Sequence, residues 1–130
     1  MQRIYQSFNR QAIMQTFGAK LGEVRSGHVE ISAPILAGSL QQHGFAHAAL
    51  IFALGDSAAG YAALSVMPEE FEVLTAEMKI NLLAPGRDGP LWAVGSVEKA
   101  GKRLVIVRAD VFDGKTKIAL MQGTMVPIKA

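Results

Sequence analysis

Residues 46–66 read AHAALIFALGDSAAGYAALSV, and this stretch decides the fold. It is apolar on nearly every side of a helix, and a single acidic residue, Asp56, stands at its middle. A charge at the centre of a membrane-spanning helix costs about 2.5–3.5 kcal/mol on insertion scales. The stretch is also rich in alanine and glycine rather than leucine. We therefore predict a helix over residues 46–65 that is buried inside protein rather than in lipid.

The segments on either side predict the elements that enclose this helix. Residues 4–17 have apolar groups at helical spacing before Gly18, which predicts an N-terminal helix within residues 1–18. Two short strands are predicted in residues 19–37, joined by a turn at Ser26-Gly27. The later strands are expected over residues 73–83, 91–99, 104–112 and 117–127, with a hairpin signal at Asp113-Gly114.

This order of elements predicts an α+β architecture in one domain over residues 1–130. An antiparallel sheet of five or six strands would wrap around the central helix and bury it on nearly every side. Within residues 73–83, the alternation predicts Leu74, Met78 and Ile80 on one face and Thr75 on the other.

Composition excludes several classes of function. The chain has 130 residues, no cysteine and a net charge of +2. Without cysteine there is no disulfide scaffold, thiol nucleophile or cysteine-based zinc site. Lysine and arginine are scattered, so we expect no nucleic-acid partner. The N-terminal residues have no apolar signal core, and we expect a cytoplasmic protein with no membrane partner.

Asp56 is the residue most in need of an explanation. A carboxylate inside an apolar helix has a large desolvation cost unless it has partners. It is either a structural residue, bonded to nearby backbone or to Ser57, or a nucleophile or general base whose pKa is tuned by burial. The residue by itself leaves both readings open.

The start of the same helix offers a second feature. The first backbone N–H groups, at His47, Ala48 and Ala49, have no partner within the helix and suit an oxyanion. Asp56 follows Ala48 by eight residues, which is about 12 Å along the axis and about 80° around it. Reacting groups must approach to about 3–3.5 Å. If both features act together, they come from two subunits of a symmetric dimer with two shared sites.

Residues 41–58, QQHGFAHAALIFALGDSA, resemble the signature of hotdog-fold thioesterases of the phenylacetic-acid-degradation type. That signature has Asn or Gln, then His-Gly-Gly six residues later, then Asp nine residues after the His. Gln41, His47 and Asp56 fall at those spacings. Residues 77–86, EMKINLLAPG, resemble the strand of that family that ends in Pro-Gly. The resemblance covers roughly residues 20–127 and implies the hotdog fold.

The resemblance also implies roles for individual residues. Asp56 would be the nucleophile or the base that activates water. The Ala48 N–H would polarise the thioester carbonyl, and the Gln41 amide would hold the substrate or the attacking water. The Thr75 hydroxyl would help to place that water. In the family, Gln41 and Ala48 come from one subunit, and Asp56 and Thr75 from the other.

The chain departs from the family at Ala48-Ala49, where Gly-Gly is usual, and the added methyl groups would either narrow the thioester channel or block it. His47 either orients the loop through its ring or caps the helix. Further contacts with the substrate are predicted in three places. Ala49 would line the thioester channel, and Phe52 or Tyr61 would line the apolar slot for the acyl group. Lys102 and Arg103, or Arg87, would meet the phosphates of coenzyme A at the mouth or are simply solvated.

These observations predict an acyl-CoA thioesterase that acts as a homodimer, with a homotetramer also expected. No cofactor is predicted besides the coenzyme A of the substrate. No metal site is predicted, because the three histidines have no carboxylate at ligand spacing. A non-catalytic acyl-CoA-binding protein is the alternative that Ala48-Ala49 motivates, and a hotdog dehydratase ranks third. The sequence does not predict the acyl group.

Overall fold

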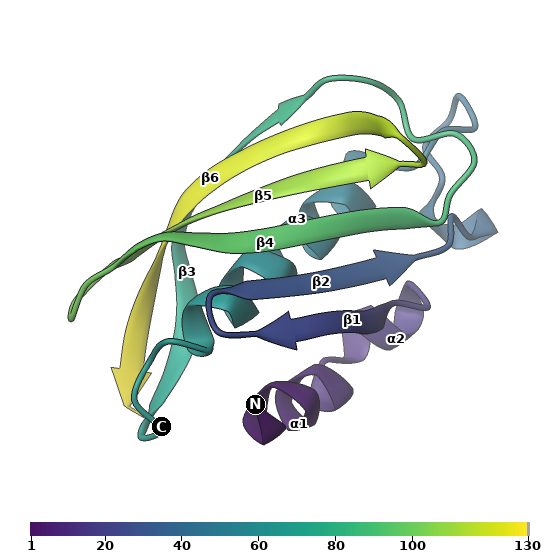
Figure 1. The fold of residues 1–130 in the computed structure, drawn as a ribbon. Coiled ribbons are helices and arrows are strands. Elements are labelled where there is room, and N and C mark those ends of the chain that lie inside the picture. Colours follow the sequence, from purple (N-terminus) through teal and green to yellow (C-terminus); the bar gives the residue numbers. More distant parts are fainter. Residues whose placement is uncertain (130) are drawn as a thin grey trace.

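The computed structural model describes residues 1–129, in which a curved sheet covers one long helix (Figure 1). In chain order, the elements are α1 (Gln2–Arg10), α2 (Ala12–Thr16), β1 (Lys20–Arg25), β2 (His28–Ala33), η1 (Ala37–Ser39), α3 (Ala48–Leu64), β3 (Phe71–Leu82), β4 (Leu91–Ala100), β5 (Val105–Asp113) and β6 (Thr116–Lys129). Within the described residues the six strands are ordered β1-β2-β4-β5-β6-β3, and each neighbouring pair is antiparallel. The predicted α+β architecture is therefore confirmed.

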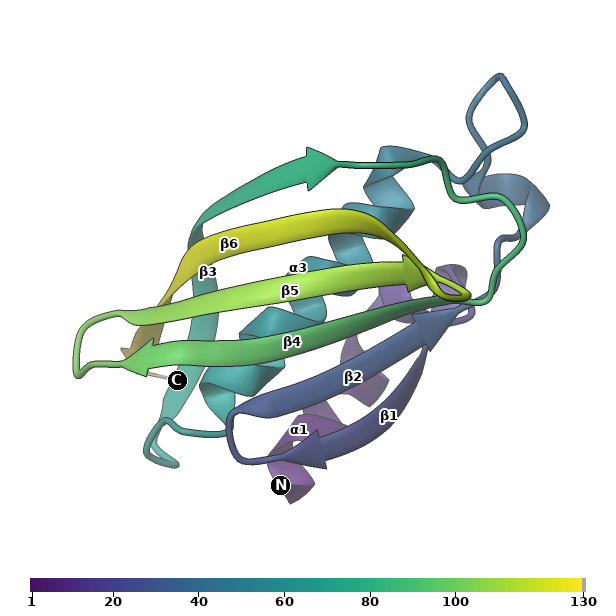
Figure 2. The same ribbon diagram turned by 45° about the horizontal axis from the view of Figure 1, so that its top comes forward.

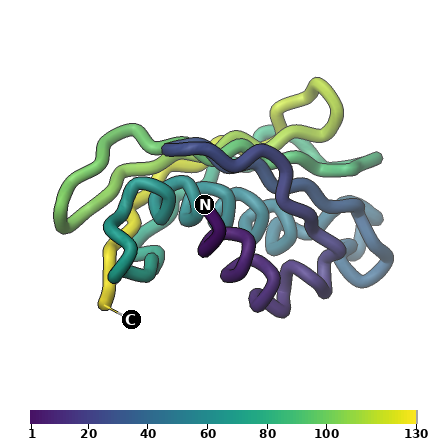
Figure 3. Tube along the Cα trace, turned by 60° about the horizontal axis from the view of Figure 1, so that its bottom comes forward, coloured from purple at the N-terminus to yellow at the C-terminus, as the bar shows by residue number. Residues whose placement is uncertain are grey.

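The helix α3 lies between the concave face of the sheet and the N-terminal helices (Figure 3). Its predicted enclosure is confirmed in part: Leu50, Leu54 and Ala58 are fully buried, whereas Phe52 and Ala53 on another face are only partly buried. It starts at Ala48 rather than at residue 46, since His47 has an extended backbone and serves as the N-cap. Among residues 1–129, no helix has the length and hydropathy needed to cross a membrane.

A glycine lets α3 lie unusually close to the sheet. A Cβ atom built on Gly95 of β4 would lie 2.3 Å from the carbonyl carbon and 2.4 Å from the carbonyl oxygen of Ala58. Both partner atoms are helix backbone, which cannot rotate away as a side chain can. The small residues Ala58 and Ala59 complete this contact, and both are fully buried.

The N-terminal helix is not continuous as predicted. Gln11 has an extended backbone, with ψ 97°, and it separates α1 from α2. At this break, the side chain of Gln11 bonds to two residues of α3. Its Nε2 donates to the Tyr61 hydroxyl at 3.0 Å, and its Oε1 accepts from the Ser57 hydroxyl at 3.1 Å.

Arg3 of α1 binds the C-terminal end of α3. Its guanidinium donates to the carbonyl oxygens of Leu64 at 2.6 Å and Met67 at 2.5 Å, and to that of Pro68 at 3.0 Å. The last turn of α3 has no basic residue of its own. Arg3 therefore satisfies carbonyl groups that have no partner within a helix.

The strand β3 lies at an edge of the sheet, and its predicted alternation is wrong in its first half. The pairing with β6 shifts between Thr75 and Glu77, which leaves Ala76 as a bulge. A bulge inserts one residue and changes the face to which the following side chains point. Leu74 is consequently 54% exposed, whereas Thr75 faces α3.

Candidate active site

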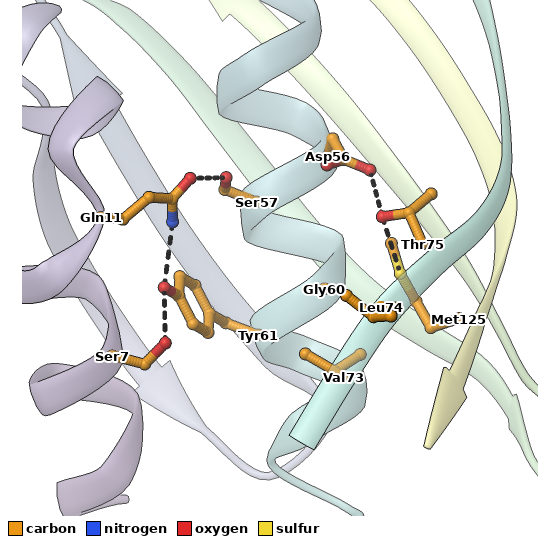
Figure 4. Close-up of a pocket in the computed structure, with 10 residues that line it drawn as sticks. All are labelled: Ser7, Gln11, Asp56, Ser57, Gly60, Tyr61, Val73, Leu74, Thr75 and Met125. Atoms are coloured by element: carbon orange, nitrogen blue, oxygen red, sulfur yellow. Dashed lines mark hydrogen bonds between the residues drawn. The ribbon is translucent and has the colours of Figure 1, made fainter. Parts of the chain in front are cut away.

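Asp56 and Thr75 meet where β3 crosses the middle of α3 (Figure 4). The Thr75 hydroxyl donates to Asp56 Oδ1 at 2.8 Å. Burial raises the pKa of the Asp56 carboxyl, and the hydrogen bond from Thr75 lowers it by less, so the pKa lies above the ordinary value of 3.8. A half-buried carboxylate with a raised pKa is suited to take up a proton.

Asp56 has few structural partners, which weakens the purely structural reading. Ser57, the neighbour that could have bonded to it, donates instead to Gln11. Across residues 1–129, the Thr75 hydroxyl is the one side-chain group that bonds to Asp56. The second carboxylate oxygen is therefore available to a ligand or to water.

A cavity of about 280 Å³, here called the Asp56 cavity, opens beside this carboxylate. The size is close to the lower end of the range of about 300–1,000 Å³ that is usual for ligand sites. Besides Asp56, its lining combines apolar and neutral polar residues from α1, the break after α1, α3, β3 and β6: Ser7, Gln11, Ser57, Gly60, Tyr61, Val73, Leu74, Thr75 and Met125.

The raised pKa predicts that Asp56→Asn is more stable than the wild type at neutral pH. The folded wild type binds the Asp56 proton more tightly than the unfolded chain does. This stabilisation is fully present below about pH 3.8 and is lost as the pH rises through the raised pKa. Asparagine does not titrate, so the Tm of the variant minus that of the wild type should grow as the pH rises from about 3.8 through the raised pKa of Asp56. Thermal unfolding at a series of pH values measures it.

The same thermal unfolding series can also contradict the raised pKa of Asp56. A Tm difference that is equal at every pH would mean that Asp56 has the same pKa in the folded and unfolded chains.

At the start of α3, one backbone amide has no partner. His47 Nδ1 accepts the N–H of Ala49 at 2.8 Å, so His47 is a helix cap. This bond occupies the Ala49 amide, which had been predicted to contact substrate. The N–H of Ala48 finds no acceptor within residues 1–129, and Ala48 is exposed. Ala48 is thus the residue that can offer an oxyanion donor here.

Gln41 lies beside this amide in a second cavity of about 490 Å³, here called the helix-start cavity. Its Oε1 accepts the N–H groups of His43 at 2.5 Å and Phe45 at 3.2 Å, which fixes the loop. No acceptor within the described chain takes the Gln41 NH₂ group, which leaves it free to bind a ligand. The lining comprises Gln41, Phe45, Ala46, His47, Ala48, Ile51, Leu82, Leu83, Ala84 and Pro85.

The two cavities share no lining residue within this chain. One contains Asp56 and Thr75, whereas the other contains Gln41, His47 and Ala48. The sequence had predicted this division from the rise of the helix, which separates Ala48 from Asp56 by about 12 Å. Within a single chain, these two groups of residues therefore line different cavities.

The predicted substrate contacts are distributed unevenly. Tyr61 lines the Asp56 cavity, but Phe52 lines neither this cavity nor the helix-start cavity. Arg87 lies over the ring of Phe45, with Cζ 4.9 Å from its centroid, and is close to the helix-start cavity.

Lys102 and Arg103 lie in the β4–β5 hairpin, at the opposite end of the sheet from the loop of residues 37–47 (Figure 2). Within one chain, Arg87 and the pair Lys102 and Arg103 therefore lie at different ends of the sheet. The prediction that Arg87, or Lys102 and Arg103, meet the phosphates of coenzyme A stays a prediction.

Two features of the site were not predicted. Ser7 and Gln11 reach the Asp56 cavity from α1 and from the break after it. Asp113, predicted only as part of a hairpin, accepts backbone N–H groups of Arg87, Asp88 and Gly89. Burial raises the pKa of Asp113, but these three bonds more than offset it and hold the pKa below the ordinary value. They fix the loop that carries Arg87.

One cluster of side chains has the spacing of a metal site. Ligand atoms of Glu23, His28 and Glu30 lie within 4.8 Å of one another on β1 and β2. These groups already have protein partners, because His28 Nε2 is 2.6 Å from Glu30, Trp92 donates to Glu30 at 2.9 Å, and Glu23 pairs with Arg25. The cluster lines neither cavity, and we assign it no role.

Comparison with known proteins identifies relatives of this fold. Residues 43–120 match the family model of the thioesterase superfamily. A thioesterase family protein from Silicibacter pomeroyi has 37% sequence identity and a TM-score of 0.94, covering 99% of this chain and 98% of that one. The PaaI protein from the phenylacetic acid degradation operon of E. coli has 22% identity and a TM-score of 0.91, covering 99% and 93%, and shows the fold alone. The predicted hotdog fold is confirmed by these superpositions.

A sequence relative extends the match to an archaeon. A protein from Saccharolobus solfataricus, to which an esterase activity has been attributed, is 36% identical over 84 residues. The match covers 64% of this chain and 55% of that protein, so this chain spans about half the length of that relative.

Proposed function

This chain belongs to the thioesterase superfamily, and from that premise we propose that it hydrolyses acyl-CoA thioesters at a site shared by two copies of the chain. The family supports thioester hydrolysis in general, and the acyl-CoA substrate is our proposal. One observation carries it: a carboxylate of raised pKa lies in one cavity, and an unpaired helix-start amide lies in the other.

In the proposed reaction, Asp56 of one copy removes a proton from a water molecule that Thr75 helps to hold. The resulting hydroxide attacks the thioester carbonyl carbon, and negative charge develops on its oxygen. The Ala48 N–H and the Gln41 NH₂ of the other copy stabilise that oxygen, an effect worth about 2.7–4 kcal/mol for one such donor. The carbon–sulfur bond then breaks, and the thiolate takes the proton from Asp56. Direct attack by Asp56, followed by hydrolysis of the anhydride, gives the same acid and thiol.

The free edge of the sheet supports pairing of two copies. The strand β3 is 12 residues long and has β6 on only one side within the described chain. Along and just beyond it, Leu74, Leu82 and Leu83 are 54%, 52% and 54% exposed. A long edge strand with unpaired backbone groups is a template for pairing with another strand. Antiparallel pairing of two β3 strands would bring the Asp56 cavity of each copy toward the helix-start cavity of the other.

Such an arrangement also offers a role for the separated basic residues. In an antiparallel pair, the β4–β5 hairpin of one copy points toward the end of the other copy that carries Arg87. Lys102, Arg103 and Arg87 would then surround one mouth and attract the phosphates of coenzyme A. A homotetramer and a cytoplasmic location remain predictions.

The non-catalytic alternative rests on Ala48-Ala49 in place of Gly-Gly. The geometry favours hydrolysis, because Ala48 is the first residue of a regular helix and keeps a free N–H. A thiol-release assay with a panel of acyl-CoAs, run beside calorimetry, separates the two functions. Micromolar binding without thiol release by the wild type would establish the binding protein and remove the enzyme.

The shared site predicts complementation between inactive variants. Asp56→Asn and Gln41→Glu should each be nearly inactive alone, because each spoils both sites of a symmetric dimer. Glutamate keeps the acceptor that holds the 43–45 loop and loses the NH₂ donor. In a mixed dimer, one site regains both partners. Unfolding and refolding of an equimolar mixture should therefore restore about a quarter of the wild-type thiol release, since about half of the dimers are mixed.

In the control, the Asp56→Asn chain is mixed with a double variant that carries both Asp56→Asn and Gln41→Glu. That mixture should stay inactive, because no dimer contains an intact site. No restoration in the first mixture would show that each chain works alone, whereas activity in the control would show that hydrolysis does not need Asp56.

A further inference from the structure

We propose that the Asp56 cavity selects acyl groups that carry a neutral hydrogen-bond acceptor, such as a carbonyl oxygen, at the end remote from the thioester. The inference rests on the proposed function, because it takes the acyl group to lie beside Asp56. It is carried by four polar residues at the other end of the cavity, here called the polar cluster: Ser7, Gln11, Ser57 and Tyr61.

The polar cluster is a continuous chain of hydrogen bonds (Figure 4). The Ser57 hydroxyl donates to Gln11 Oε1 at 3.1 Å, and Gln11 Nε2 donates to the Tyr61 hydroxyl at 3.0 Å. The Tyr61 and Ser7 hydroxyls are 3.0 Å apart. Each of the four residues also lines the cavity, so the chain of bonds forms part of its wall.

The polar cluster has more hydrogen-bond donors than its own hydrogen bonds use. Gln11 Nε2 carries two N–H groups, of which the bond to Tyr61 uses one. Ser7 and Tyr61 together carry two hydroxyl protons, and the single contact between them uses one. The cluster therefore has donors left for a ligand. It contains no positive charge, so a neutral acceptor suits it better than a carboxylate, which Asp56 in the same cavity would repel.

An alkyl tip would leave these donors without water and without a partner. Burying an unpaired polar group costs about 1–3 kcal/mol, which corresponds to roughly 5–150-fold in binding. We therefore expect about 10–100-fold discrimination between acyl groups that differ only at this tip.

The glycine at position 60 makes room for the acyl group. Gly60 lies one helical turn after Asp56 and lines the same cavity. A Cβ atom at this position would meet Met125 at 3.8 Å, which is an ordinary contact. Alanine is thus accommodated by the protein, and its methyl group would occupy cavity space. Alanine is also the better helix former.

The test uses pairs of acyl-CoAs with the same number of heavy atoms. The pairs are 4-oxopentanoyl-CoA against 4-methylpentanoyl-CoA, and 5-oxohexanoyl-CoA against 5-methylhexanoyl-CoA. The dissociation constants of their non-hydrolysable thioether analogues are measured by calorimetry, and kcat/KM by thiol release. The wild type should prefer the oxo member of at least one pair by about 10–100-fold. Gln11→Met and Tyr61→Phe should each reduce this preference at least about 10-fold.

Matched variants make the result specific. Gln15→Met makes the same chemical change in α2 at an exposed residue that lies outside the cavity, and should keep the wild-type preference. Gly60→Ala should weaken binding of the longer pair about 10-fold more than that of the shorter pair. Tyr61→Phe keeps the ring that packs against Phe8, with centroids 6.3 Å apart, so it provides a second variant if Gln11→Met does not fold.

The outcomes separate this inference from the proposed function. Equal binding within every pair, or a preference that survives both Gln11→Met and Tyr61→Phe, would overturn the inference even if the wild type hydrolyses all four substrates. Selective binding of the oxo analogues without thiol release would instead overturn the proposed hydrolysis and leave the selectivity of the cavity established.

Discussion

Replacement of Asp56 by asparagine is expected to lower kcat for acyl-CoA hydrolysis by about 10²–10⁴-fold. Asparagine has the same shape, and its side-chain oxygen still accepts the Thr75 hydroxyl that bonds at 2.8 Å in the wild type. It cannot remove a proton from water or attack the thioester. The change should therefore act on kcat, with little effect on substrate binding, and steady-state thiol release measures both parameters.

Two controls test whether loss of activity in Asp56→Asn has a cause other than the missing carboxylate. Asp110→Asn makes the same change on β5, where the carboxylate pairs with Lys117 at 3.3 Å and lines neither cavity, and it should keep the wild-type kcat. Asp56→Asn should also be more stable than the wild type at neutral pH, so loss of activity would not reflect unfolding. Equal turnover by Asp56→Asn and wild type would remove Asp56 from the mechanism.

The second large effect concerns stability. Gly95→Ala is expected to lower the free energy of unfolding by about 3 kcal/mol and Tm by about 10 °C. The new methyl would lie 2.3 Å from the backbone of Ala58, so α3 or β4 must move. Because α3 fills the sheet along its length, a shift at this point disturbs packing at both ends. Thermal unfolding followed by circular dichroism measures the change.

Two other glycines calibrate this expectation. Gly38→Ala places its methyl in open space, with no atom within 4 Å, and should change stability by no more than about 0.5 kcal/mol. Gly55→Ala would meet the sulfur of Met121, a flexible side chain, and should fall between the two. A wild-type Tm for Gly95→Ala would contradict the close contact between α3 and β4.

The fold could largely be predicted because its signals are local. Alternation and turn residues identified each strand, and the uniform hydrophobicity of residues 46–66 required an enclosed helix. Two details were missed, the bulge at Ala76 and the break at Gln11. Both depend on contacts with distant partners, namely β6 for the bulge and the side chains of Ser57 and Tyr61 for the break. No pattern within a few residues of either position encodes them.

The residues of the candidate site also divide into those that a local stretch of sequence predicts and those that depend on distant contacts. Asp56, Ala48 and Gln41 could be proposed from the sequence because helix geometry and a spaced motif lie within one stretch. Gln11 was missed because it reaches the cavity from a position 46 residues before Ser57. The separation of Lys102 and Arg103 from Arg87 could not be anticipated either, since it depends on which end of the sheet each loop occupies.

The bonds from Arg3 to the end of α3 have a consequence for synthesis on the ribosome. They join residues 61 and 64 positions apart, so the first helix leaves the exit tunnel long before its partner carbonyl groups exist. Until then, the nascent chain presents Ile4, Phe8 and Met14 to solvent, although all three are buried in the finished molecule. Closing so long a loop adds an entropic cost that the contacts with α3 must offset. The amino-terminal segment can therefore dock only after α3 and the turn that follows it have been synthesised, and its apolar side chains stay uncovered until then.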